Sequence, residues 1–367
     1  MSNVSRTPQR GLKNDQGPRI NRRQIGAGLV ATLGLAVTGF GQNNRGADAG
    51  GPPVTDTASA PTTEFADPEV ETLATIPIGI HVVGGIITDD AVWAVSEDEM
   101  MFRIDPATNQ VVDEVPVPGI GYRFDIGHGA AWTTDFEASV VRRVDLDSGA
   151  LIAEITTGVN PEGIDVTDDA VWVADHRGGT VTRIDPATNL VVATITVGPP
   201  GPAGPQPIAV DGDRVWTGVP NLNQVVGIDA ATNEVVANVD VPAACGEMEV
   251  LDGAVWVTSC FEDDIVNIVD AESGTLRGAI ETGGFAGTPL PIDNLVWIPT
   301  VQLEEGHPGR ILGINPWTLD IVDTISLDVA AYTAGVGFES VWLFSYDAGV
   351  VIRLPLDPFQ THAERRH

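Results

Sequence analysis

Acidic side chains and one arginine recur at fixed distances before a series of tryptophans. Arg123 and Glu247 stand nine residues before a Trp, and Asp125, Asp165 and Glu249 stand seven before one. Carboxylates gathered around an arginine could bind a cation, or a ligand that carries a basic group. We predict Asp125, Asp165 and Glu249 as metal candidates, with Mg²⁺ or Ca²⁺ as the ion. The alternative, a solvated channel in which the arginine only offsets the acids, stays open.

Other side chains near the same positions extend this set of candidates. The predicted ligand-binding residues are His81, Arg123, Glu162, Glu247, Tyr332 and Tyr346. His176 follows Asp175 and could act as a general base with Glu162, although a loop histidine that only forms hydrogen bonds is the alternative. No nucleophile elbow, Walker loop or dinucleotide fingerprint is present. We therefore lean towards a protein without catalytic activity.

Seven tryptophans mark a repeat that must position these side chains. They are Trp93, Trp132, Trp172, Trp216, Trp256, Trp297 and Trp342, separated by 39, 40, 44, 40, 41 and 45 residues. Three of these tryptophans are followed by a similar turn sequence. It is Asp-Pro-Ala-Thr-Asn at 105–109 and at 185–189, and Asp-Ala-Ala-Thr-Asn at 229–233. Repeats of this length built from short apolar strands are typical of propeller blades. The sequence predicts an all-β, seven-bladed β-propeller of four-stranded blades.

The third repeat predicts how one blade is built. Its four strands are expected at 163–166, 170–175, 180–184 and 190–197, where Val, Ile and Thr dominate. The seventh repeat lacks a fourth strand, whereas residues 70–79 resemble the outer strand of the third repeat. We expect that N-terminal strand to complete the last blade, because this pairs an otherwise open sheet edge.

The irregular loops fall on one face of the predicted ring. The insertion at 198–207 precedes the inner strand of the fourth repeat, and the insertion at 302–309 follows the Trp strand of the sixth. Loops before inner strands and loops after Trp strands belong to the same face. Binding sites in repeat folds usually lie on such loops. The seven regular tryptophans should pack between blades, and Trp317, which is out of register, should be partly exposed.

The N-terminus has the composition of an export signal. Arg22-Arg23 precede an uncharged apolar run over residues 25–40, and Ala47-Asp48-Ala49 offers a cleavage site. We predict a signal peptide of the twin-arginine type over 1–49, with an uncleaved anchor as the alternative. A linker rich in Pro, Thr and Ala follows at 50–68, then the propeller at 69–357 and a tail at 358–367.

The net charge limits the partners that the chain can bind. It is −32 for the whole chain, and Lys13 is the only lysine. Nucleic acid and anionic membrane surfaces are therefore poor partners, apart from the contact of the signal segment with a membrane. Peptides, cell-wall fragments or proteins remain, and we expect a monomer.

Two cysteines are placed to pair. Cys245 lies in the loop before the fifth inner strand, and Cys260 follows the Trp strand of the same blade. These loops are neighbours on one face, so we predict a disulfide in an exported chain.

The repeats resemble those of a known superfamily. Residues 170–189, from Ala-Val-Trp to Asp-Pro-Ala-Thr-Asn, resemble YVTN-type propeller repeats and the streptogramin (virginiamycin B) lyase-like propellers. The resemblance implies a seven-bladed propeller over about residues 69–357, and for the lyases a magnesium ion with a set of His and Glu residues. The later repeats offer only one histidine for such a set, His307, which lies in an inserted loop with Glu304 and Glu305.

Together these features predict an exported propeller that binds or scaffolds a ligand at its loop-rich face without turnover. A metal-assisted lyase or hydrolase that uses His176, Glu162 and Asp175 is the alternative.

Overall fold

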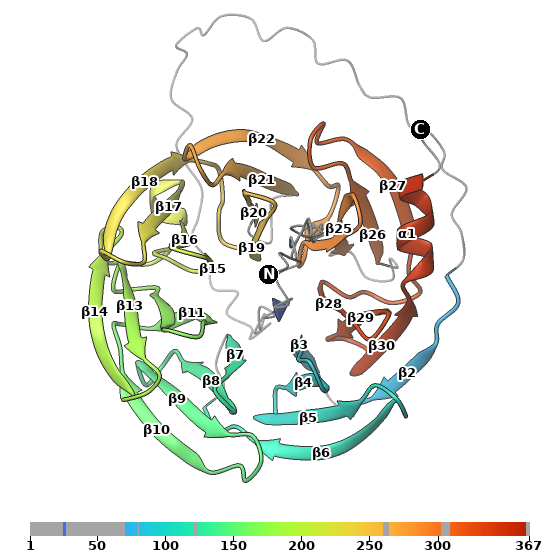
Figure 1. Cartoon of the computed structure of the whole chain (residues 1–367), viewed down its shortest axis with the longest axis horizontal. Coiled ribbons are helices and arrows are strands. Elements are labelled where there is room, and N and C mark those ends of the chain that lie inside the picture. Colours follow the sequence, from blue (N-terminus) through green and yellow to red (C-terminus); the bar gives the residue numbers. More distant parts are fainter. Residues whose placement is uncertain are drawn as a thin grey trace, which may run out of the picture.

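The computed structural model describes residues 25–26, 70–79, 81–119, 123–259, 264–301 and 309–364. Seven antiparallel sheets form a ring around a central axis, with one sheet per blade (Figure 1). Successive tryptophans lie in successive sheets, which confirms the predicted seven-bladed propeller. No helix in the described ranges has the length and hydrophobicity that a membrane crossing requires.

Each blade runs from an inner strand at the axis to an outer strand at the rim. Blades 1 to 3 consist of β3 (Val82–Ile87), β4 (Val92–Ser96), β5 (Met100–Asp105) and β6 (Gln110–Pro116), then β7 (Phe124–Gly127), β8 (Ala130–Asp135), β9 (Val140–Asp145) and β10 (Leu151–Thr156), then β11 (Pro161–Val166), β12 (Val171–Asp175), β13 (Thr180–Asp185) and β14 (Leu190–Thr196). The third blade therefore follows its predicted strands to within a few residues.

Blades 4 to 6 keep the same order. They consist of β15 (Ile208–Asp211), β16 (Arg214–Val219), β17 (Gln224–Asp229) and β18 (Glu234–Asp240), then β19 (Met248–Leu251), β20 (Ala254–Thr258), β21 (Ile265–Asp270) and β22 (Thr275–Glu281), then β23 (Phe285–Ala286), β24 (Leu290–Ile292), β25 (Leu295–Val301), β26 (Arg310–Ile314) and β27 (Ile321–Ser326). A short 3-10 turn at Pro220–Leu222 follows β16, and β23 and β24 are two separate pieces that both pair with β25.

The two ends of the propeller meet in blade 7. This blade holds β28 (Thr333–Gly337), β29 (Ser340–Ser345) and β30 (Val350–Pro355), and β2 (Ala74–Pro77) pairs antiparallel with β30 as its outer strand. The expected closure of the ring by the N-terminal strand is therefore confirmed. A two-residue strand, β1 (Ile25–Gly26), lies within the region predicted as a signal peptide and pairs with β3.

A C-terminal helix follows the last blade, where the sequence had suggested only a tail. The helix α1 (Asp357–Glu364) lies beside β27 and β30 (Figure 1). Its Phe359 is fully buried and packs edge-on against Trp297 at 5.1 Å between ring centroids. The helix thereby covers part of the core between blades 6 and 7.

Arginines link neighbouring blades across the buried tryptophans. Arg143, Arg183 and Arg353 lie 4.7, 4.9 and 4.8 Å from the rings of Trp132, Trp172 and Trp342, and each donates to a turn carbonyl and an asparagine of the next blade. Those asparagines are Asn189, Asn233 and Asn109, all with φ near +58°. Asn tolerates the left-handed conformation and also provides an acceptor, which explains why it ends these turns.

Candidate functional site

An ion pair between two distant blades crosses the axis at the loop-rich face. Arg123 precedes β7 of blade 2 and Glu247 precedes β19 of blade 5, which lie on opposite sides of the ring (Figure 1). Arg123 Nη1 donates to Glu247 Oε2 at 2.8 Å, and Nη2 donates to the carbonyl of Gly246 at 3.1 Å. Both side chains are about 5% exposed. The ion pair is therefore removed from bulk water, and the structure brings these two ligand-binding candidates together.

Glu162 and His176 lie beside this ion pair. Glu162 belongs to β11, and its Oε2 lies 3.3 Å from His176 Nδ1. Burial raises the pKa of Glu162 to about 7, although the charge of Arg123 and a hydrogen bond from Gln206 oppose the shift. Burial and the neighbouring Arg177 lower the pKa of His176. Both shifts favour the uncharged forms, so this contact is not a full ion pair near neutral pH. We call Arg123, Glu162, His176 and Glu247 the mouth cluster.

The insertion before blade 4 packs onto His176. The backbone N–H of Ala203 donates to His176 Nε2 at 3.3 Å, and Gly201 N–H donates to the carbonyl of Arg177 at 3.0 Å. A Cβ on Gly204 would lie 1.9 Å from the backbone oxygen of His176, so only glycine allows this approach. His176 is consequently only 8% exposed. A covered imidazole whose nitrogens face the protein is poorly placed to act on a substrate.

Asp175 does not join His176 in a catalytic arrangement. Its carboxylate accepts hydrogen bonds from Gly158 N–H at 2.9 Å, Thr180 Oγ1 at 2.8 Å and Thr182 Oγ1 at 2.7 Å. Burial raises its pKa to about 6 against the effect of these donors. The structure thus brings Glu162 and His176 together. Asp175, at the end of β12, instead binds β13 and the loop before β11.

Asp125 and Asp165 connect neighbouring inner strands. Asp125 Oδ2 accepts from Val166 N–H of blade 3 at 2.6 Å, and Asp165 Oδ2 accepts from Val210 N–H of blade 4 at 2.9 Å. Each carboxylate therefore bonds to the inner strand of the next blade. This structural role accounts for two of the three predicted metal candidates.

Glu249 occupies the same repeat position but cannot make the same contact. The corresponding residue of the next blade is Pro291, which has no N–H to donate. Glu249 makes no hydrogen bond or ion pair within the described ranges. Burial raises its pKa well above the usual value, and the charges of Asp165, Glu247 and Asp125 raise it further. It is half-buried by surface area yet surrounded by protein, as expected for a side chain at a narrow axis.

The described residues contain no group of three His, Cys, Asp or Glu side chains that could hold a metal ion. Asp125 and Asp165 are committed to backbone donors, and the raised pKa of Glu249 favours its protonated form. The arrangement is a poor fit for Mg²⁺ or Ca²⁺, which require ionised oxygen ligands. These three residues therefore give no support to the predicted ion, which stays a prediction.

A second cluster of candidates lies where blade 7 meets blade 1. The rings of His81 and Tyr346 are stacked, with centroids 4.3 Å apart and an interplanar angle of 16°. Glu97 joins them, because His81 Nδ1 lies 2.8 Å from its Oε2 and the hydroxyl of Tyr346 donates to its Oε1. The side chain of His81 is 50% exposed, so this cluster is open to solvent.

Tyr332 lies between the two clusters. It is half-buried and packs edge-on against Phe285 at 5.7 Å. Burial raises its pKa, and the charge of Glu247 raises it further. The six ligand-binding candidates therefore lie in two clusters with Tyr332 between them. Glu97 is a further partner, which the sequence signalled only by its place after a Trp strand.

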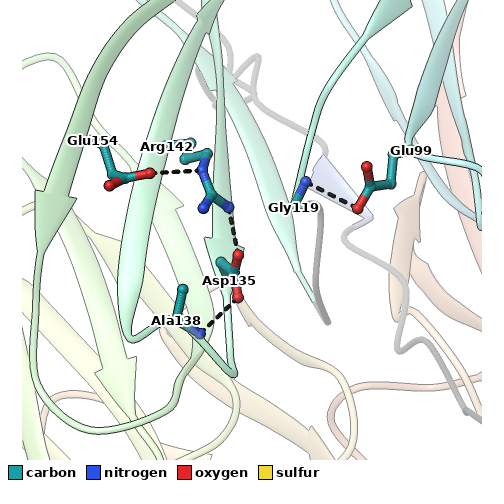
Figure 2. A network of polar contacts seen from close by, with 6 residues as sticks. All are labelled: Glu99, Gly119, Asp135, Ala138, Arg142 and Glu154. Carbon is teal, nitrogen blue, oxygen red and sulfur yellow. Dashed lines mark hydrogen bonds and ion pairs between the residues drawn. The ribbon is translucent and has the colours of Figure 1, made fainter.

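A polar network at the edge of blades 1 and 2 anchors the same face. Arg142 contacts Asp135 and Glu154, the N–H of Ala138 donates to Asp135, and Glu99 accepts from Gly119 N–H at 3.0 Å (Figure 2). Asp135 is the last residue of the Trp strand of blade 2, as Asp175 is in blade 3. Acidic residues at this position thus accept hydrogen bonds from loop N–H groups, which is a structural role.

Several predicted features cannot be placed. Cys245 is buried, whereas Cys260 lies outside the described residues, so the disulfide stays a prediction. His307, Glu304 and Glu305 also lie outside them, as do the linker and nearly all of the predicted signal peptide.

Comparison with solved structures identifies the fold. Virginiamycin B lyase from Staphylococcus aureus superposes with a TM-score of 0.63 at 15% identity, covering 77% of this chain and 98% of that one. The fold is that of a streptogramin B lyase-like β-propeller. A streptogramin B lyase structure gives a TM-score of 0.62 at 16% identity, with 77% and 96% covered. BamB from Moraxella catarrhalis gives 0.56 at 13% identity, with 81% and 99% covered.

No family model matches the chain, and no curated protein matches it. At these identities the likeness is one of fold, because propellers of this kind carry unrelated functions.

Proposed function

We propose that this streptogramin B lyase-like propeller is an exported, non-catalytic binding or scaffold module. Its ligand would sit at the loop-rich face around the axis, over the mouth cluster. The observation that carries this proposal is the buried Arg123–Glu247 ion pair, which joins side chains from opposite blades. A buried ion pair contributes little net stability compared with apolar residues of similar volume. Its presence at the mouth is better explained by recognition than by holding the ring together.

The ring has other means of staying closed. The arginine links across the tryptophans, the Asp125 and Asp165 bonds between inner strands, and the β2–β30 pairing all connect neighbouring blades. The mouth cluster is therefore available for a role other than closure.

The state of the catalytic candidates supports binding without turnover. His176 is covered by the loop before blade 4, and the carboxylate of Asp175 is occupied by three donors. In blades 6 and 7 the corresponding inner positions carry Thr288, Leu290, Thr333 and Gly335, none of which can act as a general base. The similar lyases share the fold of this chain at 15% and 16% identity, so we do not propose their reaction for it.

The chemistry of the mouth suits a peptide, a cell-wall fragment or a protein segment. Half-exposed aromatic rings at His81 and Tyr346 can pack against apolar groups, while Glu97 and Asp347 favour basic ones. The net charge of −32 disfavours nucleic acid and anionic lipid. Export rests on Arg22-Arg23 and the apolar run after them.

Ligand-induced stabilisation tests this function. The probes are soluble peptidoglycan fragments and a pool of random octapeptides, and the readout is the melting temperature of the protein from residue 50 onwards. We compare the wild type with the double variant Arg123→Gln/Glu247→Gln. The matched control is Arg277→Gln/Asp270→Asn, which removes an exposed ion pair on the opposite face.

We expect a saturable rise in melting temperature for the wild type and the control, and at least a tenfold weaker response for the mouth variant. Equal responses in all three proteins, or no response to either probe, would contradict a ligand site at the mouth. Chromatographic detection of a cleaved or eliminated product would contradict the non-catalytic assignment.

Export is tested separately in cells. The variant Arg22→Lys/Arg23→Lys should accumulate inside the cell as an unprocessed chain, whereas the wild type is recovered outside the cytoplasm. Unchanged fractionation of the variant would contradict export by the twin-arginine route.

A further inference from the structure

An exposed tryptophan stands on the face opposite the mouth cluster. Trp317 lies in the turn between β26 and β27 of blade 6, and 71% of its surface is exposed. The other seven tryptophans are 4% exposed or less. The turns between third and fourth strands in blades 1 to 5 place small or acidic residues at this position, namely Ala107, Asp147, Ala187, Ala231 and Glu272. A large apolar side chain is therefore not needed at this position to form the turn of a blade.

The rest of the same turn has a structural explanation that does not extend to Trp317. Leu319 takes the position of the turn asparagines, and its φ of +63° is unfavourable for leucine. Its side chain packs onto Gly278 of β22, where an added Cβ would lie 2.6 Å from Leu319 Cδ1. The preceding blade carries Ile268 at the position where blades 2, 3 and 7 carry the linking arginine. Leu319 thus replaces a polar link between blades with an apolar one.

The indole of Trp317 takes no part in that link. The backbone N–H of Trp317 donates to Asn315 Oδ1 at 2.9 Å, a bond that any residue except proline could make at this position. Leu319 anchors the turn, and Leu276, 44% exposed on β22, lies two residues from the Gly278 that Leu319 covers. The seam between blades 5 and 6 therefore carries two exposed apolar side chains, Trp317 on the turn of blade 6 and Leu276 on β22 of blade 5. Exposed apolar and aromatic side chains of this kind are typical of interaction sites.

The surrounding turns give this face a strongly negative charge. Acidic residues occupy the turns between first and second strands and those between third and fourth strands: Asp89, Asp90, Asp105, Asp145, Asp147, Asp168, Asp169, Asp185, Asp211, Asp213, Asp229, Asp252, Asp270, Glu272, Asp293 and Glu339. Two arginines on this face are engaged in ion pairs, Arg103 with Asp90 and Arg277 with Asp270. The negative charge of this face therefore favours a partner segment that carries positive charge.

We propose that Trp317 anchors a basic polypeptide segment of a partner protein on this face. The indole takes the aliphatic stem or the cationic head of an Arg or Lys side chain, and neighbouring turn carboxylates such as Glu272 and Asp320 receive further basic groups. The same negative charge disfavours a nucleic acid or an anionic lipid surface. This site lies on the opposite face from the mouth cluster and does not rest on the function proposed there.

Trp317 is its own reporter, because it is the only exposed tryptophan of the eight. The probes are two amidated octapeptides, one alternating Arg with Leu and one alternating Glu with Leu. The readouts are the shift of the fluorescence maximum and the protection of the emission from acrylamide quenching. Affinity is measured in parallel by calorimetry, so that variants without the indole can be compared.

We expect the Arg peptide to shift the emission to shorter wavelength and to protect the indole, with a salt-dependent affinity, while the Glu peptide does neither. Trp317→Ala should weaken binding at least tenfold. The matched control Leu190→Ala, which truncates another exposed apolar residue on the outer strand β14, should bind as the wild type does. Arg123→Gln/Glu247→Gln should also bind normally, which separates this site from the mouth.

Equal binding by the wild type and Trp317→Ala would overturn the proposal, as would protection of Trp317 by the Glu peptide. Anionic vesicles or single-stranded RNA that protect the indole better than the Arg peptide would overturn the choice of partner.

Discussion

Arg183 of blade 3 donates a hydrogen bond from Nη1 to the side chain of Asn233 in the turn of blade 4, at 3.1 Å. The same nitrogen bonds the carbonyl of Ala230 at 2.7 Å, and the guanidinium lies 4.9 Å from the ring of Trp172. One side chain therefore packs on the core of its own blade and fastens the next one. Because the two residues are 50 positions apart, their contact depends on the ring being assembled.

This relationship predicts the cost of losing the arginine. Arg183→Leu removes two hydrogen bonds and a cation–π contact, so we expect a loss of about 2–3 kcal/mol in the free energy of unfolding by urea. Arg183→Lys keeps the charge but not the planar fork, and should recover only part of the loss. Arg277→Leu, which removes an exposed ion pair within one blade, should cost about 1 kcal/mol or less. Similar losses for Arg183→Leu and Arg277→Leu would contradict the link.

The partner of Arg183 allows strain and hydrogen bonding to be separated. Asn233 has a φ of +59°, so Asn233→Ala should lose the acceptor and also pay about 1 kcal/mol or more of backbone strain. Asn233→Gly also loses the acceptor, but glycine adopts this positive φ without strain, so its stability should fall between those of the wild type and Asn233→Ala. Urea unfolding of the three proteins checks the order, and an alanine variant as stable as the glycine variant would contradict it.

The ion pair at the mouth predicts strongly non-additive variants. Arg123→Gln or Glu247→Gln alone leaves a charge buried without its partner, which should cost about 3–5 kcal/mol. The double variant removes both charges and should be more stable than the sum of the single effects implies. A double-mutant cycle from urea unfolding measures the coupling. Additive single effects would mean that the two charges do not depend on each other.

The raised pKa of Glu162 predicts a specific pH dependence. Between the unfolded value near 4.5 and the folded value of about 7, the folded state binds more protons than the unfolded state. Stability contributed by this group therefore falls as pH rises through that window, by up to about 3 kcal/mol. Glu162→Gln should match the wild type at pH 4 and exceed it in stability at pH 8.

A carboxylate with the opposite shift serves as the control for this measurement. The pKa of Asp270 is lowered by hydrogen bonds from Ser273 and Arg277, so its contribution is present above the unfolded pKa and lost in acid. Asp270→Asn should therefore lie below the wild type at pH 8 by a constant amount down to about pH 5. A Glu162→Gln curve parallel to that of the wild type from pH 4 to pH 8 would show that Glu162 does not titrate in this window.

The predicted disulfide can be checked by counting thiols. We expect no free thiol in the exported protein, because Cys245 and Cys260 would close a loop of about 15 residues and stabilise the fold by about 3 kcal/mol. Reduction or the variant Cys245→Ser/Cys260→Ser should lower the urea midpoint accordingly. Two reactive thiols in the unfolded, unreduced protein would rule the bond out.

Local patterns were sufficient to predict the fold. The Trp period, the alternation of short apolar strands and the Asp-x-x-Thr-Asn turns are set by residues close in the chain, and they led to the correct strands. The closing of the ring by residues 70–79 was also predictable, because the seventh repeat lacks its outer strand. The candidates around the mouth were found because repeat position determines distance from the axis.

The sequence alone thus determined the seven blades, the closing strand and the set of side chains that face the axis. Only the tertiary structure decided which of them meet, since Arg123 and Glu247 are 124 residues apart and come together across the ring. It also decided that Asp125 and Asp165 bond to the next blade whereas Glu249, opposite Pro291, does not. The physical reason is that strands and turns follow from neighbours in the chain, whereas pairing, burial and pKa depend on whatever the closed ring places nearby.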